Sequence, residues 1–365
     1  MDTNNIQRLC IDLGNGGFKG AGVRVTKPAQ DGQPEVREVF TAYLPSKVGV
    51  GDTNLGVLSL GGLGKRTRGD DKPIQVVSNE GAYLVGPNVE RYAALLERFD
   101  PSKYADSPEL RAVARALLAQ MVDGGSSEVA LIVALPVDVM MSSNAKETIK
   151  GIEAWLVGEH RFTYDGKEAR VNVRAIKAMA QPVGAFFSWG LDLNGEWARE
   201  ESDLTDAAVA VLDSGFNTLD LLLVRQGRVE KRETGGDNLG VRVAAQEIAN
   251  ALKARFGITK SLIEVDSLIR QYLDRGRVIL RKEDVTPIVR QALQSLATKT
   301  VGYVESKWGN AAEFDYVLLA GGGALALDGA IRRHIPRAEM LPDPVHANAI
   351  GLAKLAQRPG TFKGL

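Results

Sequence analysis

One short pattern occurs twice in this 365-residue chain, roughly 200 residues apart. In each copy an apolar run ends in an aspartate, a glycine follows two positions later, and a turn leads into a second apolar run. A single turn of this kind is common, but two copies indicate an internal duplication. The chain is therefore expected to form two related halves. The two copies are residues 11–19, with Asp12 and Gly14, and residues 212–220, with Asp213 and Gly215.

Both turns have the chemistry of a phosphate site. Glycine permits positive φ and close backbone approach, so exposed N–H groups can surround phosphate oxygens. An aspartate at a strand end can hold a magnesium ion, usually through water. A third segment, residues 318–324, runs from an apolar stretch through three glycines into a helix start. It could place an anionic or flat group near a helix N-terminus, although close packing of helix on strand explains these glycines equally well.

Hydrophobic periodicity predicts strands and helices that alternate in both halves. Alternation of this kind predicts an α/β layered fold. In the first half we expect strands at 8–13, 18–25, 36–44 and 128–135, hairpins within 74–85 and 162–173, and helices at 108–121 and 181–189. In the second half we expect strands at 207–212, 219–224, 229–234 and 314–319, three helical segments within 239–306, and a last helix at 346–356.

The composition is that of an ordinary soluble globular protein, with 44% hydrophobic and 25% charged residues. Acids and bases balance at 45 each, which gives no electrostatic reason for direct binding to nucleic acid or a membrane surface. The single cysteine, Cys10, excludes an intrachain disulfide and a multi-cysteine metal site, and we expect it in the core. A polar N-terminus and the lack of a long apolar run indicate a cytoplasmic protein.

The ordered set of two phosphate turns and a glycine segment resembles the superfamily of actin, heat-shock chaperones and sugar kinases. A narrower similarity is to bacterial and archaeal actin-like proteins of the ParM/StbA plasmid-segregation type. It is carried by Leu135-Pro136, by residues 235–240 (GGDNLG) and by residues 343–352 (DPVHANAIGL). The resemblance implies a duplicated, ribonuclease-H-like actin fold around a nucleotide cleft. Its halves would be residues 1–180, with a small subdomain at about 36–105, and residues 181–365, with a helical subdomain at about 238–306.

The resemblance also implies the cofactors and the residues that hold them. The cofactors would be ATP, with GTP left open, and Mg²⁺. Asp12 and Asp213 would be the carboxylates on the magnesium side, acting through water. The nucleotide would contact Gly14, Asn15, Gly16 and Lys19 on one side of the phosphates, Gly215, Asn217 and Thr218 on the other, Gly236 and Asp237 at the sugar edge, and Gly321, Gly322 and Gly323 beside the adenosine.

Gln181 begins a helix where this superfamily places the residue that orients the attacking water. Many bacterial members have glutamate at this position. A glutamine can hold water by hydrogen bonds but cannot act as a carboxylate base. We therefore expect Gln181 to be catalytic in a slow, polymer-coupled ATP hydrolysis; the alternative is a polar residue in the first turn of its helix.

By resemblance, the leading function is a filament-forming ATPase that organises or segregates plasmid DNA through a DNA-binding adaptor. The alternatives are a small-molecule kinase or phosphotransferase and a non-polymerising ATPase of the same fold. The sequence shows neither the extra domain nor the second catalytic base that a small-molecule kinase needs. We expect no peptide-binding domain after Leu365, which argues against a chaperone ATPase.

The glycine-rich segment 49–73 is long and contains several leucines, among them Leu58 and Leu60. We expect a mobile loop that contacts the next subunit of a filament; the alternative is that the leucines fold back onto their own domain.

Overall fold

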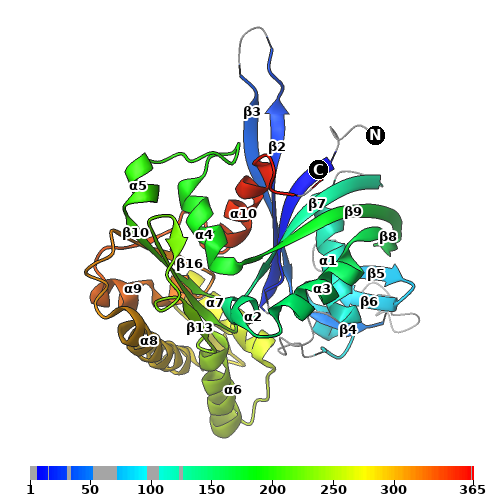
Figure 1. Cartoon of the computed structure of the whole chain (residues 1–365). Coiled ribbons are helices and arrows are strands. Elements are labelled where there is room, and N and C mark those ends of the chain that lie inside the picture. Colours follow the sequence, from blue (N-terminus) through cyan, green and yellow to red (C-terminus); the bar gives the residue numbers. More distant parts are fainter. Residues whose placement is uncertain are drawn as a thin grey trace.

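The computed structural model describes residues 6–14, 16–30, 34–51, 72–96, 107–122, 126–362 and 364–365. Two of the expectations above fall outside these ranges. They concern Asn15 and the greater part of segment 49–73, including Leu58 and Leu60. The described residues form two large β-sheets, each covered by helices on both faces, and a small two-stranded hairpin (Figure 1).

The first sheet has nine strands in the order β3-β2-β1-β7-β9-β8-β5-β6-β4. Strand β1 is antiparallel to β2 and parallel to β7, and β7 is parallel to β9. The hairpin of β2 and β3 stands out from the body of the molecule (Figure 1). The strands are β1 Ile6–Asp12, β2 Gly17–Lys27, β3 Val36–Pro45, β4 Val48–Val50, β5 Ile74–Ser78, β6 Gly81–Val85, β7 Ser126–Leu135, β8 Gly158–Tyr164 and β9 Lys167–Ala180.

Alternate residues of β1 face different helices. Leu9 and Ile11 pack with helices α1 (Pro108–Met121) and α3 (Ala145–Leu156), whereas Cys10 packs with the last helix, α10 (Ala347–Gln357). Because both faces are covered, β1 is apolar in every position from Leu9 to Ile11 rather than alternating. Cys10 is fully buried, so its expected place in the core is confirmed.

The second sheet repeats the central arrangement of the first. Strand β10 is antiparallel to β11 and parallel to β16, as β1 is to β2 and β7. The order is β12-β11-β10-β16-β17, with β13 also paired to β11. The strands are β10 Ala208–Ser214, β11 Leu219–Arg225, β12 Arg228–Val229, β13 Gly235–Asp237, β16 Tyr316–Ala320 and β17 Ala338–Met340.

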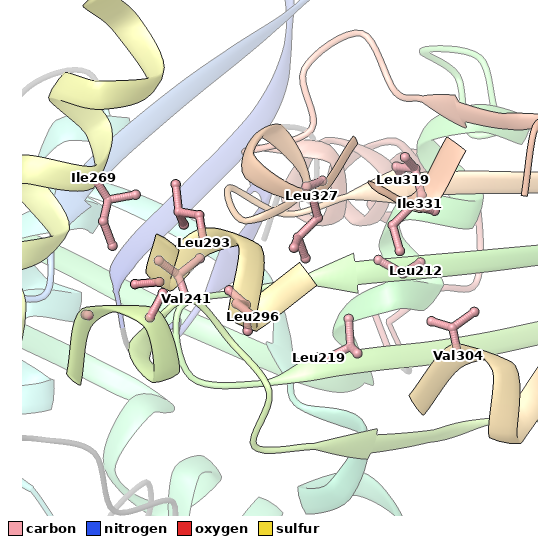
Figure 2. Close-up of a cluster of buried hydrophobic side chains, with 14 of the residues drawn as sticks. Leu212, Leu219, Val241, Ile269, Leu293, Leu296, Val304, Leu319, Leu327 and Ile331 are labelled. Atoms are coloured by element: carbon pink, nitrogen blue, oxygen red, sulfur yellow. The ribbon is translucent and has the colours of Figure 1, made fainter. Parts of the chain in front are cut away.

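Helices cover one face of the second sheet with a large apolar cluster. Figure 2 shows Leu212, Leu219 and Leu319 of the sheet in one cluster with Leu296 and Leu327 of the helices. Helix α4 (Gln181–Gly190) covers the opposite face. The helices on the clustered side are α6 Arg242–Phe256, α7 Leu262–Arg275, α8 Thr286–Trp308 and α9 Ala324–His334.

Helices α4 and α10 cross between the two sheets (Figure 1). A Cβ atom built on Gly351 would lie 1.8 Å from the carbonyl oxygen of Gly184. The helices can therefore approach this closely only where both lack a side chain. Each sheet is thus fixed to the other through two helices that share a small-residue contact.

Most predicted elements are present, with one clear error. The strand expected at residues 229–234 is wrong: only Arg228–Val229 pair as β12. Beyond it, the Thr234 hydroxyl accepts a hydrogen bond from the Leu223 N–H at 3.1 Å, where a backbone carbonyl would sit in a continued ladder.

Several elements were not expected from the sequence. A hairpin separates α7 from α8, so the helical region 239–306 is interrupted. Among the described residues, no helix is long and apolar enough to cross a membrane. The unexpected elements are helices α2 Val137–Met141, α3 Ala145–Leu156 and α5 Glu201–Thr205, the 3₁₀ helix η4 Val89–Arg91, and strands β4 Val48–Val50, β13 Gly235–Asp237, β14 Ile279–Leu280, β15 Glu283–Asp284 and β17 Ala338–Met340.

Candidate functional site

A cleft of about 920 Å³, including space open to solvent, lies where the two sheets meet. Residues from both halves line it, because β1 and β10 end at the same place. The predicted site residues among its lining are Asp12, Gly14, Gly16, Lys19, Gln181, Asp213, Gly215, Asn217, Thr218, Gly322 and Gly323.

Three predicted residues lie beside the cleft and not in its lining. Gly236 and Asp237 form β13, which pairs with the second strand of the duplicated motif. A Cβ atom at Gly236 would lie 2.8 Å from carboxylate oxygens of both Asp138 and Asp220. The third residue, Gly321, is packed beneath the cleft against β10.

The sequence left two explanations open for the glycines 321–323: close packing of helix on strand, or room for a ligand. The structure gives the first explanation to two of them and the second to one. A Cβ atom at Gly321 would lie 2.2 Å from the Ser214 carbonyl oxygen, and one at Gly323 would lie 2.3 Å from the Ser214 hydroxyl. Both glycines are therefore required for close packing of helix on strand. A Cβ atom at Gly322 would have no neighbour within 4 Å, so its backbone is open to a ligand.

Asp12 is a buried carboxylate held by two side chains. Its oxygens accept hydrogen bonds from Lys19 Nζ at 3.0 Å and from Gln181 Nε2 at 2.6 Å. Burial lowers the pKa of Lys19, but the charges of Asp12 and Asp213 outweigh that effect and raise the pKa above its ordinary value. Lys19 is therefore a fixed positive charge inside the cleft, suited to an anionic ligand.

Asp213, the duplicate of Asp12, is held by a residue to which the sequence assigned no role. Asn348 Nδ2, in the first turn of α10, donates to Asp213 Oδ2 at 2.7 Å. Burial raises the pKa of Asp213 to about 6, while the Asn348 hydrogen bond and the Lys19 charge oppose the rise. The signal in the sequence was a single amide in the otherwise apolar first turn of the last helix.

The remainder of the cleft is largely apolar and comes from α7, α9, β3 and the loops that join the neighbouring elements. Arg270 of α7, held by Asp266 at 2.7 Å, donates to the Tyr43 hydroxyl of β3 at 3.2 Å. This contact joins the two halves at the edge of the cleft. This lining offers an apolar wall for a flat ring. Its apolar residues are Pro136, Phe216, Val241, Ile269, Leu273, Leu325, Ala326 and Val345.

The two carboxylates fit a magnesium ion that takes its other ligands from water and a bound phosphate. They do not fit a metal ion that is coordinated by protein side chains alone. Among the described residues, no group of three or more His, Cys, Asp or Glu side chains could hold a metal ion. Mg²⁺ is usually bound through one or two carboxylates, waters and substrate phosphates. Asp12 and Asp213, one from each half, match that requirement.

Asp220 is a further buried carboxylate of the second motif. It accepts hydrogen bonds from Thr218 Oγ1 at 2.8 Å and from the Val137 N–H at 3.1 Å. Burial, reinforced by the charge of Asp213, raises the pKa of Asp220 from 3.8 to about 8. Asp220 therefore carries a proton at neutral pH in the folded protein.

This proton predicts a pH dependence of stability. Because the folded pKa exceeds the unfolded one, the folded chain holds a proton that the unfolded chain releases between pH 3.8 and about 8. The stabilisation is full below the unfolded pKa and declines as pH rises, by up to about 1.4 kcal/mol per unit. We expect Asp220→Asn to lose less unfolding free energy than the parent between about pH 5 and pH 8. Urea denaturation of both proteins between pH 5 and pH 8 measures the unfolding free energy. If the two free energies change with pH in the same way, Asp220 is not the group that holds the proton.

Comparisons with known proteins agree with this architecture. The family "Actin like proteins N terminal domain" matches residues 10–184, and "Archaeal actin homologue MreB-like, C-terminal" matches residues 211–333. These two matches span most of the chain, and the chain belongs to the actin superfamily. The expected duplicated actin fold, with two halves around a cleft, is confirmed.

Solved structures show the same fold over nearly the whole chain. A 15-stranded ParM filament from Clostridium botulinum has 18% identity and a TM-score of 0.71, covering 97% of this chain and 99% of that one. The archaeal actin homologue Ta0583 in complex with ADP has 16% identity and a TM-score of 0.69, covering 97% and 100%. The Alp12 filament structure has 17% identity and a TM-score of 0.58, covering 96% and 98%. No curated protein sequence matches this chain significantly.

Proposed function

We propose that this chain is an actin-like ATPase that binds ATP with Mg²⁺ in the cleft and assembles into filaments. The observation that carries the proposal is the meeting of two buried aspartates, one from each copy of the motif, at one cleft. Because residues of both halves form the site, ligand binding depends on how the two halves are positioned relative to each other. A nucleotide that contacts both halves therefore favours the closed arrangement.

The residues of the cleft supply the parts needed for phosphate chemistry. We assign the backbone N–H groups of Gly14 and Gly16, which line the cleft, to phosphate oxygens. The Gly215 N–H is already held by the Thr218 carbonyl at 2.9 Å, and Lys19 supplies a positive charge. Bound magnesium would neutralise phosphate charge beside Asp12 and Asp213. We assign to Gln181 the role of orienting a water molecule by hydrogen bonding; the hydrogen bond from its Nε2 to Asp12 at 2.6 Å, which holds it at the cleft, supports this role.

Assembly is supported by the solved filaments of a ParM protein and of Alp12, which share this fold. We further propose plasmid or DNA segregation through an adaptor protein. The balance of 45 acidic and 45 basic residues supports indirect contact with DNA.

Gln181→Ala is expected to slow ATP hydrolysis by about 10- to 100-fold and to change ATP affinity by less than about threefold. Water orientation contributes in the transition state and little in the ground state, so the rate should fall more than the binding. Single-turnover rates and fluorescent-nucleotide titration measure the two effects. Equal losses in rate and affinity would assign Gln181 to ground-state binding instead.

Filament formation is tested by light scattering and sedimentation with ATP and Mg²⁺, followed by electron microscopy. We expect polymer with ATP and Mg²⁺, and monomer in EDTA. Asp213→Asn is the negative control for the parent protein. It is chosen to keep the side-chain shape while removing one charge from the cleft. Magnesium-dependent ATP binding without polymer at any protein concentration would contradict assembly and favour a phosphotransferase, whereas absence of ATP binding would contradict the proposal as a whole.

A further inference from the structure

The two crossing helices make equivalent contacts with the two copies of the motif. Gln181, the first residue of α4, donates its amide to Asp12 at 2.6 Å. Asn348, the second residue of α10, donates its amide to Asp213 at 2.7 Å. Each helix follows the sheet of its own half along the chain. The internal duplication therefore extends beyond the aspartates to the amides that hold them.

The amide of Asn348 has a buried acceptor without a partner among the described residues. Asn348 lines the cleft and is only 5% exposed, and its Oδ1 has no hydrogen-bond partner within the described part of the chain. An ionised carboxylate only accepts hydrogen bonds, so Nδ2 must face Asp213 and Oδ1 must face elsewhere. A buried carbonyl without a partner is unfavourable, which indicates that a water or ligand group binds there.

We propose that Asn348 is a positioning residue of the cleft, the counterpart of Gln181 in the second half. Its N–H groups hold the Asp213 carboxylate toward bound magnesium–nucleotide, and its Oδ1 accepts a hydrogen bond from a water molecule of that site. This inference rests on the proposed nucleotide site and assigns a residue to it. Its effect is on magnesium-dependent binding, whereas that of Gln181 is on the hydrolysis rate.

A purely structural explanation of Asn348 is weakened by its backbone contacts. The α4–α10 crossing at this level uses the backbone of Asn348, because a Cβ atom at Gly184 would lie 2.2 Å from the Asn348 carbonyl oxygen. Asn348 Oδ1 accepts no hydrogen bond from the described residues, so the side chain does not cap α10. The amide can therefore be changed without removing the packing of the helix.

The test compares Asn348→Leu, which has a similar volume and no amide, with Asn348→Ser, which retains a small donor. Thr300→Val is the control, because Thr300 is fully buried in α8 with an unpartnered hydroxyl and lies outside the cleft lining. Three quantities are measured: the Mg²⁺ concentration for half-maximal binding of a fluorescent ATP analogue, its affinity in EDTA, and the melting temperature without ligand.

We expect Asn348→Leu to raise the half-maximal Mg²⁺ concentration by about 10- to 100-fold, the usual effect of losing a partner of a metal-side ligand. Affinity in EDTA should stay within about twofold, Asn348→Ser should be intermediate, and Thr300→Val should match the parent.

An unchanged magnesium requirement, or equal losses with and without Mg²⁺, would overturn the role of Asn348. If Asn348→Leu does not fold, Asn348→Ser is judged by the same criteria. If the parent shows no magnesium-dependent binding, the proposed function fails and this role fails with it; a normal parent with an unaffected variant overturns this role alone.

Discussion

Asp12→Asn and Asp213→Asn should each reduce magnesium-dependent ATP hydrolysis by at least about 100-fold, with the protein still folded. Each substitution removes one negative charge at the point where both halves meet the cleft. The amide oxygen can still accept the hydrogen bond from Gln181 or Asn348, and the side-chain volume is unchanged. In Asp12→Asn the amide nitrogen then faces the Lys19 ammonium, so that hydrogen bond is lost together with the charge. Loss of charge, and not loss of shape, is then the cause of the effect.

A matched carboxylate outside the cleft provides the control. Asp315 accepts a hydrogen bond from the Ala208 N–H at 2.7 Å, at the start of β10, whereas Asp213 lies near the end of that strand. Asp315→Asn should hydrolyse ATP at the parent rate. Steady-state phosphate release and circular dichroism of all three variants make the comparison. Parent-like hydrolysis by both cleft variants would refute the reading of the duplicated motif as the phosphate site.

The parts of the site that could be predicted depend only on residues that are close together in the sequence. Asp12 and Asp213 end apolar strands and precede glycine turns, so residue type, burial and backbone direction all follow from a few neighbouring positions. Lys19 follows from the same logic, because β2 pairs antiparallel with β1 and sets Lys19 opposite Asp12. The role of each residue toward a nucleotide remains a prediction.

The remaining parts depend on contacts between distant segments. Asn348 reaches Asp213 across 135 positions, and Arg270 reaches Tyr43 across 227. Packing of α10 on the first sheet is equally non-local. The expected boundary at residue 180 divides the chain by position along the sequence, and it stays a prediction. In space the division is less simple, because the last helix packs on the sheet of the first half. No local pattern specifies such pairings.

Side-chain hydrogen bonds also displaced an expected strand. Residues 229–234 have a strand-like composition, yet the Thr234 hydroxyl takes the Leu223 N–H that a continued ladder would have used. The competition between a side-chain and a backbone acceptor is decided by the tertiary position of Thr234, which is 6% exposed.

Gly351→Ala is expected to destabilise the folded protein by about 3 kcal/mol or more, the upper range for overpacking of a filled interior. The new Cβ atom would lie 1.8 Å from the Gly184 carbonyl oxygen and 2.2 Å from the Ser188 backbone nitrogen. Both neighbours are backbone atoms of α4, so no side chain can rotate to make room. The helices would have to separate, which would also displace Gln181 and Asn348 from the two aspartates.

The control is Gly302→Ala in the middle of α8, where an added Cβ atom has no neighbour within 4 Å. Alanine has the higher helix propensity, so this variant should be more stable than the parent by about 0.5–1 kcal/mol. Identical substitutions in two helices should therefore shift the thermal midpoint in opposite directions. We also expect Gly351→Ala, and not Gly302→Ala, to lose affinity for nucleotide, because only the first lies where α4 and α10 hold the cleft. Shifts of the same sign would show that the crossing can relax, and the closure of the cleft would then not depend on this contact.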